Sequence, residues 1–147
     1  MADAATRTIE VEVEPEKLFD VITDFESYPE FLGSLGLVGI KIESRGDDGM
    51  VVTQSVKKLG KTVSYTLKYK LDRPHEVAWT FVRGQMMSHN TGSWTLEKTG
   101  EGKTRATYAI EVKFGMLVPK SLVKLMVSKE LPQMVEAFKK RAESRSS

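Results

Sequence analysis

Aromatic and amide side chains that recur at every second position are the residues of this sequence best suited to hold a small molecule. The alternation is clearest in residues 62–71, where Tyr65, Leu67 and Tyr69 stand between polar neighbours. Alternate side chains of a β-strand share one face. With the apolar face inward, this period predicts a ligand-binding set that comprises Gln54, Tyr65, Leu67, Tyr69, Trp79, Phe81, Arg83, Trp94 and Tyr108.

Two interpretations of these side chains remain open. Large aromatic residues on a sheet face usually fill core volume, but a buried phenol or indole also needs a hydrogen-bond partner, which a bound carbonyl or quinone can supply. Arg83 ends a strand, where a rim position or a surface salt bridge is expected. If it points inward, its guanidinium group would hold a ligand oxygen or polarise a ketone.

The titratable residues favour binding over catalysis. His75 and His89 fall in expected turns without a second histidine or a carboxylate at ligand spacing, so no metal site is predicted. Asp24 is a potential general base, but an aspartate before a short helix is typical of an N-cap. The inward set contains no carboxylate pair, histidine base or activated nucleophile, and we therefore predict no catalytic residue and no cofactor.

Composition narrows the class of protein. The 147 residues, of which 29% are charged and 40% hydrophobic, fit a single domain over residues 1–147 with a polar tail from about residue 143. A net charge of +2 argues against nucleic-acid binding, and the lack of cysteine excludes disulfides and thiol chemistry. No signal peptide or apolar run of ~20 residues is present, so a cytoplasmic location is expected.

The elements that would position these side chains predict an α+β fold. A strand over residues 6–13 precedes two short helices between residues 15 and 32. Six antiparallel strands are expected at residues 37–45, 50–58, 62–71, 76–83, 91–98 and 103–113. A helix follows from about residue 119 to residue 142, with a kink near Pro132.

The C-terminal helix is the only expected element large enough to cover the apolar face of this sheet. One helix does not fill a strongly curved sheet, so an apolar cavity is expected between them, with Leu122 and Met126 on its wall. The stretch from Met116 to Val127 is apolar around much of its circumference, with lysines between. Its second face is therefore either buried under loops or in transient contact with a membrane surface.

Two segments resemble a known family. Residues 21–32 (VITDFESYPEFL) are similar to the aspartate, Tyr-Pro and aromatic segment of the coenzyme-Q-binding START-like proteins and of the bacterial ribosome-association toxins. Residues 92–96 (GSWTL), followed by 102–104 (GKT), resemble the late-strand pattern of the broader superfamily. The chain is thus identified as a member of the START-like (SRPBCC) helix-grip superfamily, with its subfamily left open because residues 33–36 (GSLG) replace the proline, tryptophan and cysteine of the coenzyme-Q subgroup.

The resemblance implies both a fold and a function. The fold is a curved seven-stranded antiparallel sheet with two short helices after the first strand and a long C-terminal helix over a cavity. The function is binding or transport of a hydrophobic small molecule, such as a lipid, an isoprenoid quinone or a polyketide. The alternatives are a polyketide aromatase/cyclase, which would need Arg83 and a tyrosine to converge in the pocket, and a toxin-type module that binds ribosomes through its surface, the one case in which a nucleic-acid partner is expected.

Overall fold

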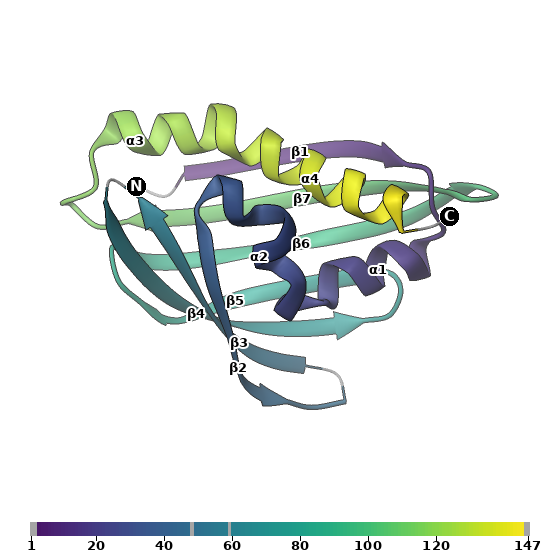
Figure 1. Cartoon of the computed structure of the whole chain (residues 1–147), viewed down its shortest axis with the longest axis horizontal. Coiled ribbons are helices and arrows are strands. Elements are labelled where there is room, and N and C mark those ends of the chain that lie inside the picture. Colours follow the sequence, from purple (N-terminus) through teal and green to yellow (C-terminus); the bar gives the residue numbers. More distant parts are fainter. Residues whose placement is uncertain (1–2, 48, 59, 146–147) are drawn as a thin grey trace.

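The computed structural model describes residues 3–47, 49–58 and 60–145. A seven-stranded antiparallel sheet curves around the C-terminal helix, which confirms the expected α+β helix-grip fold (Figure 1). The strands are β1 (Asp3–Val11), β2 (Leu37–Arg45), β3 (Gly49–Lys58), β4 (Lys61–Asp72), β5 (Glu76–Gly84), β6 (Met87–Gly100) and β7 (Lys103–Phe114). The helices are α1 (Pro15–Thr23), α2 (Tyr28–Leu32), α3 (Lys120–Leu125) and α4 (Leu131–Ser144), with 3₁₀ turns at Phe25–Ser27 and Gly33–Leu35.

The sheet has the strand order β1-β7-β6-β5-β4-β3-β2. Strands β2 to β7 form a meander, and β1 pairs with β7, so that Ile9 lies opposite Ala106. Register shifts interrupt the β2–β3, β4–β5 and β6–β7 pairs. Because bulges of this kind bend strands, they help the sheet to curve and present a concave face to the helices.

Aromatic side chains form a continuous row across the concave face. Tyr69 pairs with Trp79, Trp79 with Gly92, and Trp94 with Tyr108 in the neighbouring strands. A Cβ at residue 92 would overlap the Trp79 indole ring, so the glycine is needed for the ring to lie over β6. The row therefore depends on one small residue among large ones.

Three elements differ by more than one residue from their expected bounds. Strand β1 covers Asp3–Val11 rather than residues 6–13, because its pairing with β7 ends at Val11, where the chain turns toward α1. Strand β6 begins at Met87, so His89 lies in a strand rather than in a turn. Helix α4 continues to Ser144, past the expected start of a polar tail, and the backbone N–H of Glu12 donates to Glu143 Oε2 at 2.9 Å.

The C-terminal helical segment, which we call the lid helix, comprises α3, a π turn (Met126–Glu130) and α4. Pro132 has no backbone N–H, and just before it the N–H of Leu131 bonds to the carbonyl of Met126, five residues back. The expected interruption near Pro132 thus takes the form of a π turn. Figure 1 shows α3 and α4 as one run of helix along the concave face of the sheet.

Candidate functional site

A cavity of about 470 Å³ lies between the concave face of the sheet and the lid helix. Strands β2 to β7 contribute to its walls, and α1, α2, the 3₁₀ turn before β2 and the lid helix close the rest. Its mouth lies where the β5–β6 hairpin meets the loop after β7, since Met86 and Leu117 both line the cavity while remaining 39% and 86% exposed. The backbone N–H of Gly115 donates to the Met86 carbonyl at 2.9 Å and joins these two segments.

Most of the side chains expected to bind a ligand lie on the cavity wall. They are Gln54, Tyr65, Leu67, Tyr69, Trp79, Trp94 and Tyr108 from the sheet, and Leu122 and Met126 from the lid helix. Two others, Phe81 and Arg83, are not part of the lining. Phe81 is partly buried against the core, beside the wall rather than on it.

Arg83 does not line the cavity, although the period of two placed it in the inward set. Thr66 lies opposite Arg83 and Leu67 lies opposite Phe81, so Val82 is an extra residue of β5 without a partner on β4. This bulge reverses the alternation and places Arg83 on the convex face. There the guanidinium group donates to both Glu43 oxygens at 2.7 and 2.6 Å, with 60% of the Arg83 side chain exposed. Arg83 therefore forms a surface salt bridge, as expected for an arginine at the end of a strand.

A buried hydrogen-bond network joins three of the expected residues. Gln54 Nε2 donates to the Tyr69 hydroxyl oxygen at 2.6 Å, and the Tyr65 hydroxyl donates to Gln54 Oε1 at 3.1 Å. Gln54 and Tyr69 are both buried. The network satisfies both ends of the Gln54 amide and holds two phenols on one wall of the cavity.

Asn90 is a lining residue that the sequence analysis missed. The Trp79 indole N–H donates to Asn90 Oδ1 at 2.9 Å, and both side chains are buried. Asn90 stands just before the strand expected at residues 91–98, so the sequence pattern predicts no face for it. Counting back by twos from Trp94 would have placed it on the concave face, because β6 begins at Met87.

All four tyrosines of the sequence line this cavity: Tyr28, Tyr65, Tyr69 and Tyr108. Burial raises the pKa of each phenol above its ordinary value, to about 12 for Tyr65. The Tyr28 hydroxyl donates to the carbonyl of Ile22. At neutral pH these four groups are therefore uncharged phenols, which can donate hydrogen bonds but do not serve as bases.

Charged groups are confined to the rim of the cavity. Lys58 Nζ forms an ion pair with Glu130 of the π turn and donates to the Leu35 carbonyl at 3.2 Å. Lys61 is the other charged residue that lines the cavity, and Glu130 is its only carboxylate within the described ranges. This ion pair is not predictable from sequence patterns, because Lys58 and Glu130 come from distant segments.

The remaining titratable candidates lie outside the cavity. His75 is exposed between β4 and β5, and His89 Nε2 lies 3.1 Å from Glu111 Oε1 of the neighbouring strand, a carboxylate that sequence spacing did not indicate. The Asp24 side chain makes no cap hydrogen bond and lies 3.4 Å from Arg145 Nη1. Among residues 3–47, 49–58 and 60–145, no three His, Cys, Asp or Glu side chains are grouped to hold a metal ion, and no helix is long and apolar enough to cross a membrane.

Comparison with known proteins identifies similar sequences and structures. The family described as "Polyketide cyclase / dehydrase and lipid transport" matches residues 11–139. The ribosome association toxin RatA of Vibrio cholerae is 24% identical over 137 residues, which cover 93% of each chain. A START superfamily protein from Mycobacterium smegmatis has a TM-score of 0.81 at 18% identity, over 96% of this chain and 97% of that one. The Zhui aromatase/cyclase of Streptomyces sp. R1128 has a TM-score of 0.70 at 18% identity, over 98% and 88%.

Proposed function

We propose that this chain, which belongs to the polyketide cyclase/dehydrase and lipid transport family, binds or carries a hydrophobic small molecule in its cavity. The observation that carries the proposal is the cavity of about 470 Å³ beneath the lid helix, with aromatic and aliphatic walls and a mouth at Met86 and Leu117. The proposed ligand is a lipid, an isoprenoid quinone or a polyketide.

Apolar burial alone supports useful affinity. A ligand that buries ~300 Å² of apolar surface gains roughly 7 kcal/mol at ~25 cal/mol per Å², from which the entropy cost of association is subtracted. No ionic anchor is required. The charged residues of the lining lie at the rim, and the inner part of the cavity carries no charged side chain of the described lining. This suits a neutral, largely apolar ligand.

A polyketide aromatase/cyclase is the enzymatic alternative, and the group of buried phenols is the observation that favours it. General acid–base catalysis works best with a group whose pKa lies near the operating pH. Burial moves the phenol pKa values away from neutrality, Glu130 is paired with Lys58, and Arg83 lies on the convex face. Binding without turnover therefore remains the main proposal.

We propose two further partners that would contact the outer surface of the protein. The similarity to a protein named as a ribosome association toxin keeps ribosome binding as a proposal, with the outer surface rather than the cavity as the contact. Transient contact with a membrane surface is also proposed, supported by the exposed Met116 and Leu117 at the mouth and by the lysines beside them. Co-sedimentation with ribosomal subunits tests the first of these partners.

Native mass spectrometry of freshly purified protein tests the main proposal. Met126 lines the cavity, whereas its neighbour Leu125 is exposed and does not line it, so the two residues give a matched pair of variants. We expect a co-purifying hydrophobic compound on the wild type and on Leu125→Trp, and its loss on Met126→Trp, in which the added ring fills the cavity. Equal occupancy of both variants, or no bound compound in any sample together with ribosome binding, would contradict the proposal.

A further inference from the structure

The geometry points to a ligand whose polar group is an uncharged hydrogen-bond acceptor, such as a ketone, quinone or ether oxygen, bound by the Trp94 N–H and the Tyr108 hydroxyl. The inference rests on the proposed function, because it assumes that the cavity holds a hydrophobic ligand. It adds the chemistry of the polar group, the residues that bind it and the orientation of the ligand.

Most hydrogen-bond donors around the cavity are already used by the protein itself. The hydroxyl of Tyr28 donates to a backbone carbonyl, that of Tyr65 to Gln54, and the indole N–H of Trp79 to Asn90. These three donors therefore hold the wall together and are not available to a ligand without loss of an existing bond.

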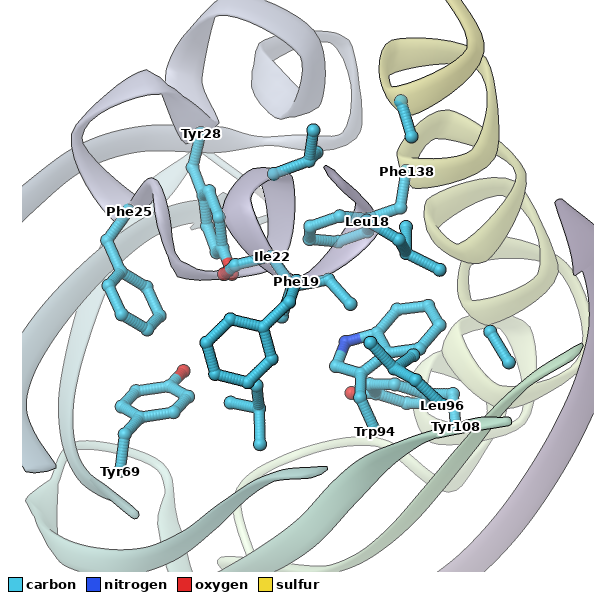
Figure 2. Close-up of a cluster of buried hydrophobic side chains, with 14 of the residues drawn as sticks. Leu18, Phe19, Ile22, Phe25, Tyr28, Tyr69, Trp94, Leu96, Tyr108 and Phe138 are labelled. Carbon is cyan, nitrogen blue, oxygen red and sulfur yellow. The ribbon is translucent and has the colours of Figure 1, made fainter. Parts of the chain in front are cut away.

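The Tyr69 hydroxyl accepts a hydrogen bond from Gln54, whereas two other aromatic side chains of the lining have no hydrogen-bond partner at all. Across the described part of the chain, neither the Trp94 indole N–H nor the Tyr108 hydroxyl meets a hydrogen-bond partner, although both side chains line the cavity and are only 3% and 6% exposed. Their rings are in contact, with centroids 5.0 Å apart. Figure 2 shows both side chains within the aromatic cluster, facing the same interior as Tyr69. Neither donor atom is among the fully buried atoms that lack a partner, so both are reachable from the cavity, where a ligand acceptor can take their hydrogen bonds.

Acceptors for a ligand are scarce in the same region. Gln54 Oε1 and Asn90 Oδ1 already accept hydrogen bonds, and the lining's carboxylate, Glu130, is paired with Lys58 at the rim. Apart from the phenol oxygens, which can also accept, the region offers few acceptors to replace the hydrogen bonds that a ligand hydroxyl or amine makes to water. No cation of the described lining lies beside Trp94 or Tyr108, since its lysines are at the rim, so a carboxylate would be desolvated there without a counter-charge.

The position of the two donors sets the orientation of the ligand. Tyr108 is six residues before Phe114, the end of β7 that pairs with Met87 near the mouth, so it lies roughly 20 Å along the strand from that end at ~3.3 Å per residue. Trp94 pairs with Tyr108 and its ring also contacts Phe138 of α4. The acceptor oxygen therefore enters first, and the apolar remainder of the ligand extends toward Leu117.

Four probes of equal chain length separate the possibilities: methyl nonyl ketone, undecane, undecanol and undecanoic acid. We expect the ketone to bind most tightly. Trp94→Phe and Tyr108→Phe should each lower its affinity by roughly tenfold, the effect of one lost hydrogen bond, and should leave undecane affinity unchanged. Binding is measured by isothermal titration, and circular dichroism with thermal melting checks that each variant is folded.

The indole N–H signals in a nitrogen-15 NMR spectrum give a second, local readout. The sequence has two tryptophans, and Trp79 serves as the internal control because its N–H already bonds to Asn90. The ketone should shift the Trp94 signal downfield much more than undecane does. Equal affinity for ketone and undecane, tightest binding of undecanoic acid, or an unmoved Trp94 signal overturns the inference and leaves the proposed function standing. Absence of binding by all four probes contradicts the proposed function itself.

Discussion

Lys58 of β3 and Glu130 of the π turn form an ion pair across the rim of the cavity, and the Lys58 ammonium group also donates to the Leu35 carbonyl. Both side chains are only 24% exposed, so water and salt screen this pair less than the outer pairs of the sheet. The pair connects the lid helix, the sheet and the turn before β2 at one point. It therefore acts against opening of the lid.

Loss of this ion pair should loosen the lid. In Glu130→Gln we expect a several-fold faster release of the co-purifying compound and faster amide hydrogen exchange in residues 126–130, because about 1 kcal/mol of closing free energy is lost. Release is followed by native mass spectrometry over time. Glu43→Gln, which removes the Arg83 partner on the convex face, is the matched control and should release the compound at the wild-type rate.

A charge on the concave face should unfold or strongly destabilise the protein, whereas a charge one residue later should not. Trp79 is buried, while Thr80 is exposed on the opposite face. Trp79→Asp should lower the free energy of unfolding by ~4 kcal/mol or more, since it removes a large core side chain and buries an unpaired carboxylate. Thr80→Asp should change it by less than ~1 kcal/mol in urea unfolding. If Thr80→Asp destabilised the protein more than Trp79→Asp, the register of β5 would be shifted by one residue.

Alkaline pH should destabilise the fold through its tyrosines. Each phenol has a higher pKa in the folded chain than in the unfolded chain, so above about pH 10 the unfolded chain has lost more protons. Stability is therefore complete below that pH and falls as pH rises, between about 10 and about 12 for Tyr65. The expected slope is roughly 1 kcal/mol per pH unit for each phenol that titrates only on unfolding.

Ultraviolet absorbance of tyrosinate measures this directly, because all four tyrosines line the cavity. In the folded protein the absorbance should stay low at pH 10 and rise together with the loss of secondary structure. Tyr65→Phe should reduce the slope of stability against pH in that window. A normal tyrosinate titration near pH 10 in the folded protein would show that the cavity admits bulk water.

The entrance half of the lid helix should be the least stable part of the cavity wall. Helix α3 contains no buried residue, and the loop before it includes the exposed Met116 and Leu117. Hydrogen exchange should be faster in residues 115–128 than in residues 62–81, and should slow in residues 115–128 when a ligand is bound, because opening and binding compete. Uniform strong protection of residues 115–138 in the empty protein would mean a static lid.

Anionic vesicles should bind at the mouth if the ligand is exchanged with a membrane. Met116 and Leu117 form an exposed apolar tip between Lys113 and Lys120. Co-sedimentation with vesicles of phosphatidylglycerol and phosphatidylcholine should fall several-fold in a Met116→Ser, Leu117→Ser double variant and in high salt. Val82→Ser removes an exposed apolar side chain of β5 that is not part of this tip, and it should have no effect. Equal binding by both variants would contradict the proposed contact.

Much of this fold is predictable because its signals are local. The alternation of residues 62–71 indicates β4 and its inward face, and Pro15 indicates the first turn of α1. The prediction of which face a side chain points to fails where one extra residue in a strand interrupts the alternation. The bulge at Val82 has no marker in the sequence, and it alone separates an inward Arg83 from the observed salt bridge. His89 was misplaced for a related reason, since the polar residues before it resemble a turn.

Contacts between distant segments could not be predicted from the sequence, for a different reason. Lys58 and Glu130 are separated by 72 residues, and nothing in the residues around either one indicates the other. The same holds for Trp79 and Asn90, whose bond depends on how β5 and β6 diverge near the cavity. Composition and period predict which residues face inward, but hydrogen-bond pairing depends on the final curvature of the sheet.

The pairing of β1 with β7 has a consequence for how the protein is made. Residues 3–11 lie at the sheet edge beside residues 104–112, so β1 has no strand partner until about two-thirds of the chain has been synthesised after it. Pairings across such long stretches of sequence place a domain among the slower folders, in the millisecond-to-second range. Until β7 and the lid helix emerge, the aromatic row lies open to water, and a hydrophobic ligand present during synthesis would meet its binding surface before that surface is enclosed.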